Sequence, residues 1–325
     1  MANQEVIITI LVYNLILICI GLIAKRKNKT EDDFFLANRG LGPWVAALSA
    51  SASSSSAWTL LGVSGAAYAW GLSAVWLLPG VLIGYYVSWT WVAPRLMELS
   101  QETGEVSLAG VLFHNYDKNE KQSLMRLSVI IITSTLILYV AAQFQAAGTT
   151  FSSILGISQE LSIILGALVI LIYTFIGGFW AVSLTDSIQA VLMVIVALIL
   201  PWMLLLIGIG GFENLSLAID ATWSTEEQNL TGLHTGLMGA GFALGTIAIG
   251  FGYPGQPFVV NRFMAAKDIQ AIKRGRIIAI IWAIIIFTGM IVLGLSAKVM
   301  YTTCLLYTSD AADEGLGVDL GGRRI

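Results

Sequence analysis

Charged residues are scarce in this sequence. Lysine, arginine, aspartate and glutamate make up 11% of its 325 residues, and 57% of the residues are hydrophobic. Soluble domains carry roughly 25% charged residues, so a chain this apolar could not cover its surface in water. The composition predicts an all-α integral membrane protein whose solvent is the lipid bilayer. The net charge of −3 adds little, since the placement of charge decides topology.

Cysteine and histidine are also rare. Cys19 and Cys304 are isolated, and so are His114 and His234. They form neither a disulfide framework nor a metal-binding spacing. The sequence has no phosphate loop, HExxH or CxxC motif, and its glycine pairs lie inside apolar runs. We therefore expect neither an enzyme nor a nucleic-acid-binding protein.

Long apolar runs dominate instead. A membrane-spanning helix needs about 20 mostly apolar residues, and eight segments qualify. They are approximately 5–24, 43–70, 73–94, 124–148, 161–180, 186–209, 234–258 and 276–300. A basic cluster follows the first segment rather than preceding it, so we interpret this segment as a retained span and not a signal peptide. We expect a tight turn near Ala181–Asp186 between the fifth and sixth spans.

The basic residues predict the orientation. They gather after the first span and in the connections between spans three and four and between spans seven and eight, the last beginning at Arg262. The connections on the other side, 71–72, 149–160 and 210–233, contain no lysine or arginine. The positive-inside rule then places the N-terminus outside, in a multi-pass protein of a bacterial cell (inner) membrane.

The end of the chain differs in character from the rest. The run from Cys304 to Ile325 is acidic and glycine-rich and has no helical period. It resembles the translated read-through of a sequencing adapter, and a native polar loop is the alternative. We expect a membrane transporter domain over residues 1–301 and a non-native tail over residues 302–325.

Serine is concentrated in the second span, where residues 53–56 are four consecutive serines. Serine competes with the backbone for hydrogen bonds and weakens a helix interior. Broken helices in transporters expose carbonyl and hydroxyl oxygens, which suit a small hard cation such as Na⁺. Close helix packing through small residues is the alternative, and spacing alone does not choose between them.

The seventh span has a similar composition. Six glycines lie between residues 239 and 255, with Tyr253, Pro254, Gln256 and Pro257 near its end. Proline within a span frees backbone groups that must be satisfied nearby. Two interrupted spans fit corresponding positions in two transporter repeats. Packing combined with a proline kink is the alternative.

A few polar side chains lie at membrane depth. Asp186 lies between two apolar spans and is a functional candidate, although after Thr185 it could also cap the next helix. Tyr139 and Gln143 are one turn apart in the fourth span, near Gln145. Interhelical hydrogen bonds or contact with a solute would explain them.

Three segments together resemble the sodium:solute symporter family, in particular its sodium/proline symporter branch. They are NRGLGPWVAALSASASSSSAWTLLGVSGAAYAWGLSAVW (38–76), YTFIGGFWAVSLTDSIQAVLM (173–193) and GQPFVVNRFMAA (255–266). The likeness runs over residues 1–301. It implies a LeuT-like fold of two inverted five-helix repeats within thirteen helices, of which this chain would hold the first eight.

The resemblance also implies the residues that carry the function. The expected Na⁺-binding set is Ala52, Ser54, Ser55 and Ser56. The expected substrate and coupling set is Arg39, Trp58, Tyr139, Asp186, Tyr253 and Gln256. In the family, the backbone carbonyls that match Ala52 and Ser55 bind the ion. Arg39 and Asp186 match charged residues linked to ion coupling and release, and the two tyrosines match aromatic residues of the substrate site.

Two positions depart from the pattern. Proline-transporting members have an aspartate important for Na⁺ affinity at Ser54 and a substrate-site tryptophan at Ile249. The first departure implies Na⁺ coupling with a different affinity, and the second leaves the solute open between proline and other amino acids. The family's remaining Na⁺ ligands, two hydroxyl residues on the ninth helix, lie outside this chain.

The resemblance thus implies Na⁺-coupled symport of a small organic solute, with Na⁺ as the coupling ion. A different class is a sensory module, because some bacterial sensor kinases carry a similar membrane domain. A kinase domain after this one would identify that class. A membrane enzyme would need a cluster of histidines or acids at membrane depth, where we expect Asp186 to stand alone.

Overall fold

The computed structural model describes residues 4–26 and 29–301, and all regular structure within these ranges is helical. The α-helices are α1 (Gln4–Lys25), α2 (Glu31–Leu36), α3 (Pro43–Ser54), α4 (Val63–Trp70), α5 (Leu77–Val87), α6 (Ala93–Thr103), α7 (Leu108–Leu112), α8 (Lys118–Leu155), α9 (Gln159–Met203), α10 (Phe212–Thr222), α11 (Gly236–Ile247), α12 (Pro257–Met264) and α13 (Ile269–Met300). Shorter 3₁₀ or π turns are η1 (Ala37–Arg39), η2 (Trp58–Gly62), η3 (Gly71–Trp76), η4 (Ser88–Val92), η5 (Leu204–Ile209) and η6 (Ala248–Gly255).

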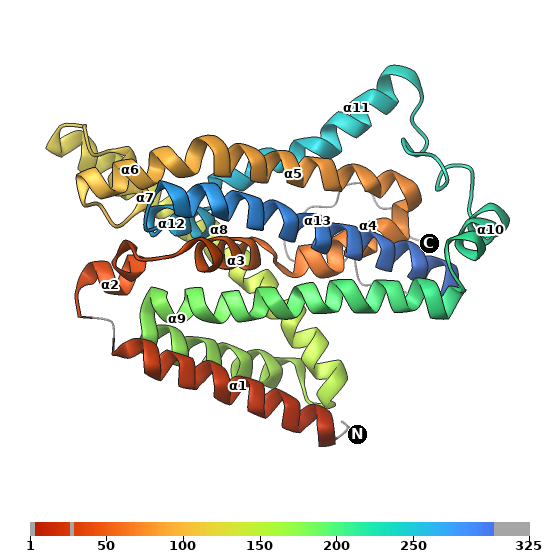
Figure 1. The fold of residues 1–325 in the computed structure, drawn as a ribbon, viewed down its shortest axis with the longest axis horizontal. Helices are drawn as coiled ribbons and strands as arrows, with labels where there is room; N and C mark the ends of the chain where they lie inside the picture. The colour runs from red at the N-terminus through yellow and green to blue at the C-terminus, as the bar shows by residue number, and fades with distance from the viewer. Residues whose placement is uncertain (1–3, 27–28, 302–325) are drawn as a thin grey trace.

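Six continuous helical stretches among the described residues are long and apolar enough to cross a membrane. Two of them reverse direction inside. The stretch Trp58–Thr103 turns at Gly71, with φ of 64°, and the stretch Gln159–Ile209 turns at Gly178, with φ of 56°. Glycine adopts such left-handed angles without a steric penalty. The stretch Gln159–Ile209 therefore contains two of the expected spans, and Trp58–Thr103 contains the span 73–94 and the second part of the span 43–70. Figure 1 shows α9 as two antiparallel halves.

The turn expected near Ala181–Asp186 is wrong. The chain reverses at Gly178, the one residue inside α9 with a non-helical backbone, and residues 181–186 lie within the second half of α9. The serine and threonine hydroxyls of this segment suggested a helix start. Thr185 instead donates to Ala181 O and Val182 O, 3.0 and 2.9 Å away, as it does inside a helix.

Both predicted interruptions are present. Helix α3 ends at Ser54 because Ser55 has an extended backbone (φ −91°, ψ 90°). The chain then enters η2 and continues as α4. In the second case η6 ends at Gly255 because Gln256 has an extended backbone (φ −80°, ψ 111°), and Pro257 begins α12. A residue before proline is driven out of the helical region by the proline ring, which explains this second break.

Helix α13 forms the centre of the bundle. It packs along α3 and α4, the two halves of the first broken helix, and against α5 and α9 (Figure 1). A Cβ at Gly294 of α13 would collide with the carbonyl oxygen of Ser64 in α4. Small residues thus bring these helices into backbone contact, as is common in membrane bundles. The second span is therefore both interrupted at Ser55 and closely packed against α13.

Helix α8 lies at the periphery. Gly148 is its one buried residue among the 38 residues of the helix, so most of its side chains lie on the surface of the described bundle. The proposed tail, residues 302–325, lies outside the described residues, and its non-native character stays a prediction.

Candidate functional site

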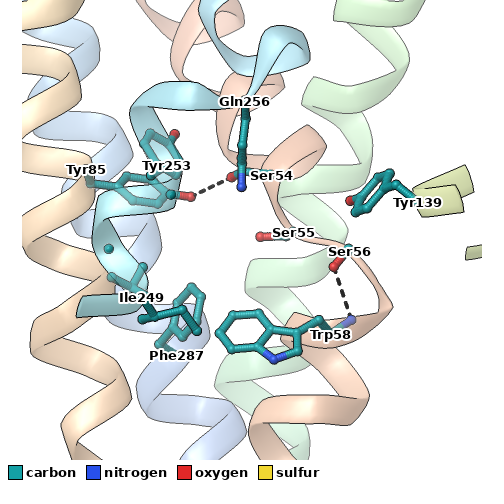
Figure 2. Close-up of a pocket in the computed structure, with 13 residues that line it drawn as sticks. Ser54, Ser55, Ser56, Trp58, Tyr85, Tyr139, Ile249, Tyr253, Gln256 and Phe287 are labelled. Atoms are coloured by element: carbon teal, nitrogen blue, oxygen red, sulfur yellow. Dashed lines mark hydrogen bonds between the residues drawn. The ribbon is translucent and has the colours of Figure 1, made fainter. Parts of the chain in front are cut away.

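A cavity of about 390 Å³ lies between the two broken helices. It is lined from α3, η2, α5, α8, η6 and α13 (Figure 2). The lining residues are Ser54, Ser55, Ser56, Trp58, Val81, Tyr85, Tyr139, Ile249, Gly250, Gly252, Tyr253, Gln256 and Phe287. The cavity brings together seven of the ten expected site residues, from segments that lie up to about two hundred residues apart in the sequence.

The C-terminal end of α3 supplies backbone oxygens beside the cavity. The amide of Ser55 donates to Ser51 O and Ala52 O, at 3.1 and 3.0 Å, and the helix goes no further. The last carbonyls of a helix have no donor one turn ahead, and this end carries the negative part of the helix dipole. A cation is therefore favoured here. Ala52 does not line the cavity and lies one turn before the break.

The other side of the break is closed by a side chain. Gln143 of α8 accepts a hydrogen bond from the amide of Ala57 through Oε1, at 2.8 Å. The amide of Trp58 donates to Ser56 Oγ at 3.1 Å, and the amide of Thr59 to Ser56 O at 2.9 Å. Of the two explanations considered for Gln143, the structure supports the interhelical hydrogen bond.

Replacing Gln143 with leucine is expected to lower stability by about 1–3 kcal/mol, because the Ala57 amide would lose its acceptor within the membrane. The measurement is thermal unfolding in detergent micelles. Thr135→Val on the exposed face of α8, where the hydroxyl bonds only its own helix, is the matched control and should change stability little. Equal effects of the two changes would contradict this role.

Aromatic side chains form much of the remaining wall. The hydroxyls of Tyr85 and Ser54 share a hydrogen bond at 2.9 Å, and the ring of Tyr85 stacks on that of Tyr253 with centroids 4.2 Å apart. Trp58 and Phe287 have ring centroids 6.2 Å apart. Sequence reasoning missed Tyr85 and Phe287, because each is one aromatic residue in an apolar span without a local mark of function.

Two polar atoms at this cavity have no hydrogen-bond partner. They are Oη of Tyr253 and Oε1 of Gln256, both buried. Polar groups in protein interiors are almost always paired, so two unpaired oxygens at one cavity are unusual. Both residues line the cavity, but both atoms are themselves covered, so a solute would reach them only after the side chains move.

The absence of a side chain at Gly250 allows two walls of the cavity, α5 and η6, to lie close together. A Cβ there would lie against Gly80 O of α5 and 3.0 Å from the amide nitrogen of Gly84. Both neighbours are backbone atoms, which cannot rotate away. The contact between α5 and η6 therefore depends on Gly250.

Asp186 belongs to a separate polar cluster. Its Oδ2 accepts hydrogen bonds from Ser49 Oγ (2.8 Å), Ser53 Oγ (2.9 Å) and Arg262 Nη2 (2.8 Å). Arg262 Nε donates to Ser49 Oγ at 2.9 Å, and its guanidinium lies 5.0 Å from the centre of the Phe179 ring. The cluster ties α3, α9 and α12 together inside the bundle.

Two sequence-based expectations fail at this cluster. Asp186 lies inside α9 and caps no helix. Arg262 was counted as a basic loop residue, yet it is 4% exposed and lies in α12. It is the main residue that sequence reasoning missed. The sequence feature that could have indicated its burial is that Arg262 is a single charge in a mostly apolar stretch.

Arg39 lies away from the cavity. Its Nη1 pairs with Asp32 at 2.7 Å, and its Nη2 donates to the carbonyl oxygens of Ser100 and Glu105 at 3.4 and 3.3 Å. It therefore joins α2 to the connection between α6 and α7, and any effect on the cavity would be indirect.

An all-helical bundle with two broken helices around an uncharged cavity is the kind of architecture found in many transporter folds. The model of the sodium:solute symporter family matches residues 34–311. The chain therefore belongs to the sodium:solute symporter family, and the expected LeuT-like fold class is confirmed.

Similar proteins include two curated relatives and one solved structure. The chain is 36% identical over 294 residues to a sodium/proline symporter of Salmonella typhimurium, covering 90% of this chain and 57% of the relative. It is 35% identical over 291 residues to the osmoregulated proline transporter OpuE of Bacillus subtilis, covering 90% and 58%. A Na⁺-coupled sialic acid symporter has a similar structure, with a TM-score of 0.75 and 18% identity, covering 89% of this chain and 60% of that one. The chain thus spans somewhat over half the length of these proteins.

Proposed function

We propose that this chain forms the site-bearing part of a symporter that couples Na⁺ to the movement of a small organic solute, proline or another amino acid. The observation that carries the proposal is the cavity between two broken helices, with the open C-terminal end of α3 beside it. The two relatives, a sodium/proline symporter and an osmoregulated proline transporter, support the solute class.

Na⁺ would bind at the break of α3. The oxygens there are the carbonyls of Ala52 and Ser55 and the hydroxyls of the neighbouring serines, which are the hard neutral ligands that Na⁺ accepts in transporters with unwound helices. The Ala52 carbonyl also accepts from the Ser55 amide at 3.0 Å, so the ion would share it or replace that hydrogen bond. The positive charge would also offset the negative end of the helix dipole.

The solute would occupy the adjacent cavity. Ser54, Ser55 and Ser56 belong both to the end of α3 and to the cavity wall. Ion binding that orders this segment would therefore shape one wall of the solute site. Coupling then follows from a difference in affinity between two states of the protein. The membrane potential contributes about 2.3 kcal/mol per charge per 100 mV.

The orientation is part of the same proposal. Burial of Arg262 removes one basic residue from the connection between α12 and α13. Lys267 remains exposed there, as do Lys273 and Arg274 near the start of α13, so the positive-inside rule still favours an N-terminus outside. No observation on the described residues favours the sensory alternative.

Replacing Ser54 with aspartate is expected to raise the apparent affinity for Na⁺ about tenfold, since a carboxylate at the end of α3 would attract the cation in a medium of low dielectric constant. The measurement is the Na⁺ concentration for half-maximal uptake by the full-length gene product. Ser54→Asn, which keeps the size without the charge, is the control. An unchanged or weaker Na⁺ affinity would count against this placement of the ion.

A further inference from the structure

The cavity has two sides of different chemistry. Figure 2 shows Gln256, Tyr253 and Ser54 on one side, and Ile249 and Phe287 on the other. The first side presents amide and hydroxyl groups, and the second presents only hydrocarbon. A solute that fills the cavity must therefore have a polar end and an apolar end.

No lining residue of this cavity is an aspartate, glutamate, lysine, arginine or histidine. The nearby cluster does not supply a free charge either, because Asp186 and Arg262 pair with each other at 2.8 Å. An ionised group buried without a partner is very unfavourable. Solutes with a charged side chain are therefore disfavoured. A neutral zwitterion can be accommodated if its carboxylate is met by the coupling cation.

The polar side offers an acceptor for the amino group. Oε1 of Gln256 receives no hydrogen bond and is itself covered, and a half-turn of the side-chain amide would exchange it with the nitrogen that faces the cavity (Figure 2). An ammonium group carries N–H donors and no acceptor, so it is the complement of this atom. Oη of Tyr253, also unpaired, lies on the same side.

The apolar side is larger than a small side chain requires. Ile249 and Trp58 are each 40% exposed, although both lie within membrane spans, and both line the cavity. Cavities of about 300–1,000 Å³ bury drug-sized ligands, and this one has about 390 Å³. A solute without a sizeable apolar side chain would leave much of this surface uncovered. Each CH₂ group buried there is expected to improve affinity roughly fourfold.

We propose that the solute is a neutral amino acid with an extended apolar side chain, of the leucine, methionine or phenylalanine type, in preference to alanine or proline. Its ammonium group donates to Gln256 Oε1, and its side chain lies against Ile249, Phe287 and Trp58. This inference rests on the proposed function and specifies its solute.

The test is competition for Na⁺-driven amino-acid uptake by the full-length gene product in proteoliposomes. Unlabelled leucine and phenylalanine are expected to inhibit at concentrations at least tenfold lower than alanine or proline, while glutamate and lysine have no effect. Proline or alanine as the strongest competitor would overturn the inference and leave Na⁺ coupling standing. Absence of Na⁺-dependent uptake of every amino acid would overturn both.

Variants at Ile249 locate the preference in the cavity. Ile249→Trp would fill the apolar side and reduce the leucine-to-alanine preference at least tenfold, while Ile249→Ala would enlarge it and shift the preference toward phenylalanine. Ile281→Trp is the matched control, because Ile281 is 52% exposed and does not line the cavity. Unchanged preferences in both Ile249 variants would overturn the placement of the side chain.

Gln256→Leu tests the polar side independently. Loss of the acceptor is expected to weaken every amino-acid substrate about tenfold without changing their order. A change of order among side chains, or no weakening at all, would contradict the placement of the ammonium group.

Discussion

Replacing Asp186 with alanine is expected to destabilise the protein by about 3–5 kcal/mol, because the change leaves a buried charge without its partner. Arg262 is 4% exposed and donates to Asp186 at 2.8 Å. The same carboxylate oxygen also accepts from Ser49 and Ser53. Removing it separates α9 from its polar contacts with both α3 and α12. The measurement is the free energy of unfolding in detergent micelles.

A second variant separates the cost of an unpaired charge from the cost of the lost contacts. The double variant Asp186→Leu with Arg262→Met replaces the pair by apolar side chains and is expected to recover most of the stability, as such replacements often do. Asp32→Ala removes a carboxylate that is 41% exposed in its pair with Arg39, and is expected to cost at most about 1 kcal/mol. A double variant no more stable than Asp186→Ala would contradict the assignment of the cost to an unpaired charge.

Replacing Gly250 with valine is expected to destabilise the protein by about 3 kcal/mol and to abolish solute uptake. The added side chain would collide with backbone atoms of Gly80 and Gly84 in α5. Because Gly250 also lines the cavity, moving η6 away from α5 would separate the walls of the solute site. Unfolding in micelles and uptake by the full-length gene product measure the two effects.

Gly245→Val is the matched control for Gly250. A Cβ at Gly245 would meet nothing within 4 Å, and this residue lies in α11 outside the cavity wall. We expect a change in stability within about 0.5 kcal/mol and normal uptake. If the two valine variants behaved alike, the close approach of α5 and η6 would not be required.

The two broken helices could be predicted from the sequence because their causes are local. The serines of residues 53–56 weaken a helix where they stand, and Pro257 constrains the residue before it. Both breaks occur at these residues in the structure. The apolar spans were visible for the same reason, since length and hydropathy are properties of each segment alone.

The partners of Asp186 could not be predicted, because they depend on contacts between distant segments. Arg262 lies 76 residues further along the chain, and Ser49 lies 137 residues before Asp186. Because Arg262 lies in the expected connection between the seventh and eighth spans, it looked like a charge that sets the topology. Tyr85 and Phe287 were missed for a related reason, since nothing in an apolar span distinguishes a residue that faces a cavity from one that faces lipid.

The sequence predicts the reversal near Ala181–Asp186, whereas it occurs at Gly178. The polar residues Ser183, Thr185 and Asp186 look like a helix start, yet Ser183 and Thr185 are buried inside α9. Gly178 adopts a backbone with φ of 56° and ψ of −155°, which suits a residue without a side chain. The adjacent glycines at residues 177 and 178 were the better indication.

The most direct test of the central claim is the ion dependence of solute uptake. Because the chain spans 57% of a curated relative, uptake of a panel of labelled amino acids is measured on the full-length gene product in proteoliposomes. An inward Na⁺ gradient is compared with an equal gradient of choline. The account predicts concentrative uptake with Na⁺ and none with choline, with a Na⁺ requirement that shifts in Ser54→Asp. Uptake that is the same with either cation would contradict it.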